Sequence, residues 1–228
     1  MPENDSLQAI LFDLDGTLIN SLPAYILSFQ ENIRATTGQM VSAEELRGRI
    51  SIPTPQILAF YAAPQQIPAM IERHNDLMRL HADQIAFYPD VREALSILHA
   101  AGLKLAVVTS QIAGELATTR AVLGIDQWIG AWINSDMVAH PKPAPDPVLL
   151  ALAQLNVQPG AALMVGDSIY DLRAGQAAGT RTAAVTWGFG KLPDLLACSP
   201  DLVLRRPEEI SRLPELLASR FESEALEG

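Results

Sequence analysis

Two aspartates, Asp13 and Asp15, stand two positions apart near the start of the chain. The apolar residues before them predict a buried strand, so both carboxylates would lie at its end, where uncompensated negative charge costs free energy unless a cation is near. An oxygen-rich site of this kind suits Mg²⁺, a hard ion that keeps several waters. Gly16 lets the chain turn sharply and brings backbone N–H groups near a ligand. Taken alone, the pattern is equally compatible with a strand followed by an acidic turn.

Two further segments carry groups that could hold phosphate. Thr109 and Ser110 follow a second apolar stretch and place hydroxyl donors where a phosphate oxygen could sit. Lys142 stands among three prolines that stiffen the backbone, and an immobilised ammonium group can bind phosphate and offset nearby carboxylates. Taken singly, the hydroxyl pair is also typical of a strand end, and the lysine of a solvated proline-rich loop.

A third apolar stretch ends in Asp167, Ser168 and, four residues after the first aspartate, Asp171. Carboxylates with this spacing face the same way on a helix that begins at Ser168. Asp167 would then be a further acidic ligand of a metal ion. Asp171 would accept a hydrogen bond from Lys142 or Ser168, or lie in the outer shell of the ion.

The elements that must position these groups follow from hydrophobic patterning. Short apolar runs predict strands, and between them lie stretches with helical periodicity. The strands are expected at 9–14, 103–109, 162–165 and 182–187, with a weaker one at 201–204. Strands that alternate with helices of 10–12 residues indicate a doubly wound α/β fold with a parallel sheet covered on both faces. Ligands of such sheets bind beyond the carboxyl ends of the strands, which is where every candidate residue falls.

One interval is too long for a simple βαβ unit. Thr17 and Thr109 are 92 positions apart, whereas a βαβ unit needs only about 30 residues. The intervening residues predict further helices at 23–36, 43–49, 55–61 and 68–82, with no convincing strand. We therefore expect a catalytic core at 1–19 and 88–228 and an inserted helical cap at 20–87, which would exclude water and select substrates. The alternative is that these helices simply extend the core.

Composition narrows the function further. The 228 residues carry a net charge of −10, which argues against a nucleic-acid binder because that class needs a basic face. The single Cys198 excludes an internal disulfide and a multi-cysteine zinc site. No apolar run reaches the ~18–20 residues of a membrane span, and the first residues lack the pattern of a signal peptide. A cytoplasmic protein, monomeric or homodimeric, that binds a small phosphorylated metabolite is expected.

The four motifs, in this order, resemble those of the haloacid dehalogenase-like superfamily of phosphatases, and the resemblance covers nearly the whole chain. It implies that Asp13 attacks phosphorus and becomes an aspartyl phosphate, and that Asp15 is the acid for the leaving alcohol and then the base for water. It also implies that Mg²⁺ is held by the carboxylates of Asp13 and Asp167 and the backbone carbonyl of Asp15. The resemblance further implies that Thr109 and Lys142 hold the phosphoryl group, and we expect Ser110 and Gly16 to bind phosphate with them.

Within that superfamily the chain is similar to phosphoglycolate phosphatases and related pyrophosphatases, mainly at 11–20, 162–171 and 175–182. The expected reaction is hydrolysis of a small phosphate ester or of pyrophosphate. A phosphomutase, a receiver-like signalling module and an idle binding protein remain alternatives. Arg47 and Arg49, in the predicted cap, are candidates for contacting a second anionic group, although solvated surface arginines would look the same. The isomer of the Lys142–Pro143 bond is not readable from sequence.

Overall fold

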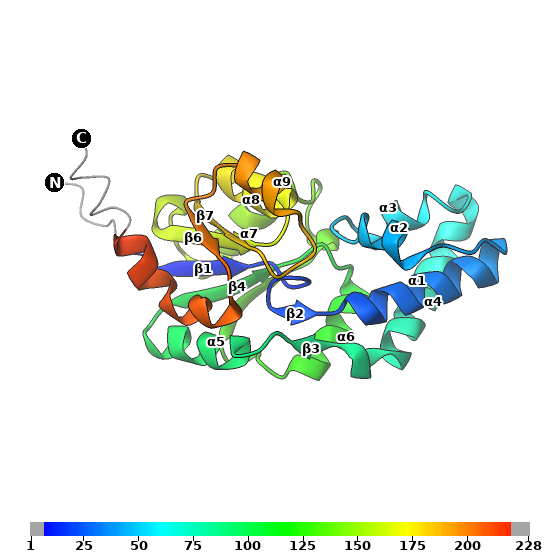
Figure 1. Cartoon of the computed structure of the whole chain (residues 1–228), viewed down its shortest axis with the longest axis horizontal. Coiled ribbons are helices and arrows are strands. Elements are labelled where there is room, and N and C mark those ends of the chain that lie inside the picture. Colours follow the sequence, from blue (N-terminus) through cyan, green and yellow to red (C-terminus); the bar gives the residue numbers. More distant parts are fainter. Residues whose placement is uncertain (1–6, 220–228) are drawn as a thin grey trace.

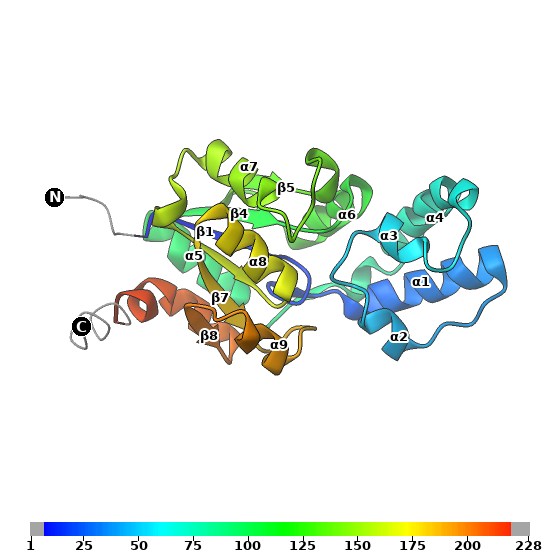
Figure 2. The same cartoon turned by 90° about the horizontal axis from the view of Figure 1, so that it is seen from above.

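A six-stranded parallel sheet forms the centre of the molecule, in the order β5-β4-β1-β6-β7-β8 (Figures 1 and 2). The computed structural model describes residues 7–219. The strands of this sheet are β1 (Ala9–Phe12), β4 (Lys104–Val108), β5 (Ile129–Ile133), β6 (Ala162–Gly166), β7 (Arg181–Val185) and β8 (Leu202–Leu204). The predicted parallel α/β fold is thereby confirmed.

Helices cover both faces of this sheet. The α-helices are α1 (Leu22–Thr37), α2 (Ala43–Arg47), α3 (Thr54–Leu58), α4 (Ile67–Leu80), α5 (Val91–Ala100), α6 (Ala113–Leu123), α7 (Asp146–Leu155), α8 (Ile169–Ala178) and α9 (Leu192–Ala197). Short 3-10 helices lie at Pro64–Gln66, Ala82–Gln84, Ser135–Met137, Pro159–Ala161 and Pro207–Arg212. In Figure 1, α7 and α8 lie on one side of the sheet and α5 lies on the other. Among residues 7–219, no helix combines the length and the hydrophobicity that crossing a bilayer requires.

The central strands end level with one another. Phe12, the last residue of β1, is paired with Val107 of β4 and with Val165 of β6. All four residues of β1 are buried, because strands in the middle of a parallel sheet are covered on both faces. This register brings the residues that follow β1, β4 and β6 to a common edge.

Three short strands differ from the sequence-based expectation. The edge strand β5 was not predicted, because a glycine, Gly130, interrupts its five residues and weakens the strand pattern. The segment 20–87 was expected to contain helices and no strand, but β2 (Ile19–Asn20) pairs antiparallel with β3 (Ala86–Phe87). Two-residue strands are too short to leave a periodic pattern in the sequence.

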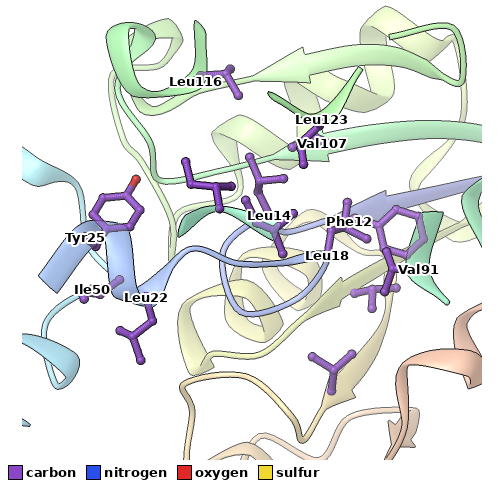
Figure 3. Close-up of a cluster of buried hydrophobic side chains, with 14 of the residues drawn as sticks. Phe12, Leu14, Leu18, Leu22, Tyr25, Ile50, Val91, Val107, Leu116 and Leu123 are labelled. Carbon is purple, nitrogen blue, oxygen red and sulfur yellow. The ribbon is translucent and has the colours of Figure 1, made fainter. Parts of the chain in front are cut away.

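Helices α1 to α4 lie beyond the carboxyl ends of the sheet strands rather than on its faces (Figures 1 and 2). Helix α1 packs along α4, and Phe29, Ile33, Met70 and Met78 are buried between these elements. The apolar cluster is nevertheless continuous with the sheet: Figure 3 shows it passing from Phe12 on β1 to Leu22 and Tyr25 on α1.

One buried carboxylate fastens these helices to α6. Glu115 is fully buried in the first turn of α6, where its Oε2 accepts a hydrogen bond from the backbone N–H of Ile112 at 2.9 Å. Its Oε1 accepts a hydrogen bond from the Thr54 hydroxyl on α3 and lies 2.9 Å from Nε2 of His74 on α4. Glu115 on α6 thus accepts a hydrogen bond from Thr54 on α3 and lies beside His74 on α4, so it contacts two helices of the 22–80 segment.

Replacing Glu115 with Ala should lower the free energy of unfolding by about 2–4 kcal/mol, since it leaves the buried Ile112 N–H and Thr54 hydroxyl without their acceptor. Chemical denaturation measures the loss. Glu72→Ala, at an exposed position of α4, is the matched control and should change stability by less than about 0.5 kcal/mol. Equal losses in the two variants would contradict the role given to Glu115.

Candidate active site

The predicted site residues converge at the carboxyl edge of the sheet. Asp13 follows β1, Ser110 follows β4 and Asp167 follows β6. One small pocket is lined by residues that follow the sheet strands and by two residues of the segment that carries α1 to α4. The lining residues are Asp13, Asp15, Ile50, Ser51, Ser110, Lys142, Asp167, Ser168 and Asp171. The pocket has a volume of about 20 Å³, enough for about one water molecule.

Lys142 is buried at the centre of this arrangement. Its Nζ donates to Asp13 Oδ1 at 2.6 Å, to Asp171 Oδ1 at 2.5 Å and to the carbonyl of Val108 at 3.0 Å. Burial alone would lower the pKa of Lys142, but the charges of Asp13 and Asp171 outweigh it and raise the pKa above its usual value. The lysine is therefore a fixed positive charge. The Lys142–Pro143 peptide bond is cis.

Three buried aspartates crowd around that single ammonium group. Carboxylate oxygens of Asp13, Asp167 and Asp171 all lie within 4.8 Å of one another. Burial, and then the charge of Asp171, raise the pKa of Asp13 well above its ordinary value. The same causes raise the pKa of Asp167 to about 7, although the backbone N–H of Phe189 donates to its Oδ2 at 2.5 Å. The cluster thus holds more negative charge than its surroundings neutralise, and its all-oxygen donor set fits a hard divalent cation.

Asp171 is held in place by the start of α8. Its Oδ2 accepts hydrogen bonds from the backbone N–H of Ser168 at 3.0 Å and from the Ser168 hydroxyl at 2.5 Å. The sequence left open whether this aspartate bonds to Lys142 or to Ser168, and in the structure it accepts from both. Gly166 makes this approach possible, because a Cβ there would lie 2.2 Å from Cβ of Asp171.

Asp15 has a separate set of partners. Its Oδ1 accepts hydrogen bonds from the Ser21 hydroxyl and from Nε2 of Gln111, the latter at 3.1 Å. Burial raises the pKa of Asp15 to about 6, and the bond from Ser21 opposes that shift. Neither Ser21 nor Gln111 was among the predicted site residues. Both lie just after predicted strand or motif positions, but an isolated hydroxyl or amide there carries no distinctive pattern.

The remaining candidates for binding phosphate, which are Ser110, Thr109 and Gly16, make different contacts. The Ser110 hydroxyl donates to the carbonyl of Ser51 at 3.4 Å, whereas Thr109 is buried and its Oγ1 accepts from the backbone N–H of Gln111 at 3.1 Å. Gly16 has φ of +89°, and a Cβ on it would lie 2.3 Å from Asp167 Oδ2. Its N–H donates to the carbonyl of Ile19 at 2.8 Å, so in this structure that donor is used within the turn.

The two predicted arginines do not join the carboxylates. Arg47 is exposed. Arg49 lies 4.7 Å above the ring of Phe60 and 3.5 Å from a carboxylate oxygen of Glu45. It borders a neighbouring pocket of about 330 Å³, which shares Ser51 with the pocket of the aspartates.

Comparison with known proteins agrees with this geometry. The family model described as haloacid dehalogenase-like hydrolase matches residues 10–185, a range that includes every residue lining the pocket of the aspartates. The pyrophosphatase PpaX of Bacillus pumilus is 32% identical over 208 residues, which cover 90% of this chain and 95% of that protein.

Solved structures share the architecture. A candidate phosphoglycolate phosphatase from Lactobacillus plantarum has a TM-score of 0.81 at 31% identity, with 91% of this chain and 99% of that chain covered. CbbY from Rhodobacter sphaeroides, solved in complex with phosphate, has a TM-score of 0.80 at 26% identity, with 90% and 96% covered.

The raised pKa of Asp167 predicts how stability depends on pH in EDTA. The folded chain retains a proton on this residue between its ordinary pKa of 3.8 and about 7, so the stability it contributes falls as pH rises through that window. The free energy of unfolding of the wild type, relative to Asp167→Asn, should therefore drop by roughly 2 kcal/mol between pH 5 and 7.5. Denaturant titrations across this range measure the difference.

Asp194→Asn, at an exposed position of α9, controls for loss of one negative charge. Its difference from the wild type should stay within about 0.5 kcal/mol over the same range. A pH-independent difference for Asp167→Asn would mean that the aspartate is already ionised without a cation.

Proposed function

The chain belongs to the haloacid dehalogenase-like hydrolase family, and we propose that it is a Mg²⁺-dependent phosphohydrolase that acts on a small phosphate ester or on pyrophosphate. The observation that carries the proposal is the position of Lys142, which fixes the Asp13 carboxylate beside Asp171 at the edge of the sheet. A nucleophile, a balancing cation and a second, separately held aspartate are thereby gathered around one pocket.

In the proposed reaction, an oxygen of Asp13 attacks phosphorus while the bond from phosphorus to the leaving oxygen breaks. The Asp15 carboxylic acid gives its proton to that leaving oxygen, and the chain is left with an aspartyl phosphate on Asp13. Asp15, now a carboxylate, takes a proton from a water whose oxygen attacks phosphorus while the bond from phosphorus to the Asp13 oxygen breaks. Inorganic phosphate leaves and both aspartates return to their starting states. Dividing the displacement into two steps lowers each barrier.

The surroundings of Asp15 support the dual role. A general acid that later becomes a base works best when its pKa lies near the operating pH. Burial raises the pKa of Asp15 to about 6, so both protonation states are accessible near neutrality. An aspartate with its ordinary value of 3.8 would be a poor proton donor there.

The cation that the aspartates require is proposed to be Mg²⁺. The carboxylates of Asp13 and Asp167 and the backbone carbonyl of Asp15 would hold it, with Asp171 remaining bound to Lys142. When bound, the ion would neutralise charge that keeps a carboxylate and a phosphate apart. Lys142, which is hydrogen-bonded to Asp13, contributes a second positive charge, and the hydroxyls of Thr109 and Ser110 are proposed to donate to phosphate oxygens.

We further propose that residues 20–87 are a cap that selects the substrate. Ile50 and Ser51 from this segment close the pocket over the aspartates, and the remaining volume of about 20 Å³ is too small for a phosphate ester. A substrate can enter only if the segment moves. Its leaving group would then extend toward the larger pocket beside Arg49.

The similarity to a pyrophosphatase and to a candidate phosphoglycolate phosphatase supports substrates with a second anionic group next to the phosphoryl group. Arg49, on the larger pocket, is proposed to meet that group.

Phosphate release from phosphoglycolate, pyrophosphate, sugar phosphates, nucleoside monophosphates and p-nitrophenyl phosphate tests the proposal. We expect turnover with Mg²⁺ and none in EDTA, and Asp13→Asn should lower kcat by more than about 10³-fold because the nucleophile is lost. Asp194→Asn, on the exposed side of α9, is the control and should retain activity. If no compound releases phosphate, the hydrolase proposal fails and transfer between two organic molecules becomes the better explanation.

Arg49→Ala should raise KM for the best doubly anionic substrate about 10-fold, while KM for p-nitrophenyl phosphate changes by less than about 2-fold, since only the former carries a second anion. Steady-state kinetics provide both values. Arg73→Ala, at an exposed position of α4, controls for loss of positive charge. A rise in KM that is the same for both substrates would argue that Arg49 supports the fold of this loop instead.

A further inference from the structure

Gln111 is a buried amide for which the proposed reaction has no role. It lies two residues after Thr109 and is 2% exposed. Its Nε2 donates to Asp15 Oδ1 at 3.1 Å and to Thr119 Oγ1, on α6, also at 3.1 Å. A side-chain amide nitrogen has two hydrogens, so both are used.

The contact with Asp15 fixes which way the amide points. With nitrogen and oxygen exchanged, Oε1 of Gln111 would face a carboxylate oxygen, and two acceptors would meet. In the orientation observed, Oε1 is buried without a hydrogen-bond partner among the described residues. Burying an unsatisfied carbonyl costs free energy, and the donor that Nε2 supplies to Asp15 is the contact that offsets it.

The backbone of Gln111 is also held on both sides. Its N–H donates to Thr109 Oγ1 at 3.1 Å, and its carbonyl accepts from the N–H and the hydroxyl of Ser135, both at 3.0 Å. A residue locked by surrounding hydrogen bonds can place its side chain within the narrow tolerance that catalysis requires.

The hydrogen bonds to Asp15 all fall on one oxygen. Ser21 and Gln111 both donate to Oδ1, and within residues 7–219 no hydrogen bond to Oδ2 is found. An oxygen that already accepts two hydrogen bonds is the poorer place for a proton, so Oδ2 is left to carry and exchange it. Asp15 also borders the pocket of the aspartates.

We propose that Gln111 is a positioning residue for the general acid: it holds Oδ1 of Asp15 and turns Oδ2 toward the leaving oxygen. This rests on the proposed role of Asp15. Gln111 would touch neither substrate nor metal, and its effect would pass entirely through the carboxyl group it orients.

Gln111→Met, which keeps the length of the side chain and removes the donor, tests the proposal. kcat/KM reports the step that breaks the ester bond, and that step needs an acid for an alkyl leaving group but hardly for p-nitrophenolate. We expect kcat/KM to fall about 10- to 100-fold for the best alkyl phosphate and less than about 3-fold for p-nitrophenyl phosphate. Thr118→Val, which removes a neighbouring hydroxyl on α6 bonded only within that helix, should leave the ratio of the two unchanged.

A double-mutant cycle separates positioning from a structural effect. Adding Gln111→Met to Asp15→Asn should cost less than about 2-fold further, because the group it acts through is already gone. Losses that multiply in the double variant, or a Gln111→Met loss equal for both substrates, would overturn the proposal. If Asp15→Asn itself shows no preference for the alkyl ester, the proposed function of Asp15 fails, which is a different outcome. Thermal melting of each variant identifies one that does not fold.

Discussion

The rest of the site depends on one ammonium group buried between two carboxylates. Lys142 brings Asp13 and Asp171 together across three separate segments of chain and uses its third hydrogen on the carbonyl of Val108. Removing these charges from water is expensive, and only their mutual attraction in this geometry offsets the cost. Asp167 lies outside this ion pair, and burial, followed by the charge of Asp171, raises its pKa. An excess of negative charge at this edge is therefore built into the fold.

The close packing of backbone around Asp167 also requires glycine at three positions. A Cβ on Gly16 or Gly188 would fall within 2.4 Å of an atom of Asp167 or of the Gly16 carbonyl, and on Gly190 it would lie 1.9 Å from the backbone oxygen of Asp167. Two loops, the one after β1 that carries Gly16 and the one after β7 that carries Gly188 and Gly190, thus approach Asp167 closely. Glycine at these positions follows from the need to surround a carboxylate with backbone, because side chains would keep the loops apart.

The sequence allowed the strand ends to be predicted, and with them Asp13, Lys142 and Asp167, because buried parallel strands are apolar and continuous and the polar residues after them stand out. It did not reveal Gln111, since a single amide has no pattern and its partner Asp15 is 96 residues away. The edge strand β5 was missed for a related reason: its stability comes from pairing with β4 rather than from its own residues. What depends on local pattern was predictable, and what depends on contacts distant in sequence was not.

The pairing of β2 with β3 brings together the two ends of the segment that carries α1 to α4. Because Ile19 lies opposite Phe87, the chain leaves toward α1 and returns from α4 at adjacent points, about 5 Å apart as in any antiparallel pair. An insert whose two ends meet can be lengthened, shortened or exchanged without shifting the strands on either side. A replacement would be constrained by the apolar cluster around Leu22, by the polar groups that meet Glu115 and by the contact of Ser51 with Ser110. We therefore expect the residues of the site at the sheet edge and the helices α1 to α4 beyond it to change at different rates in evolution.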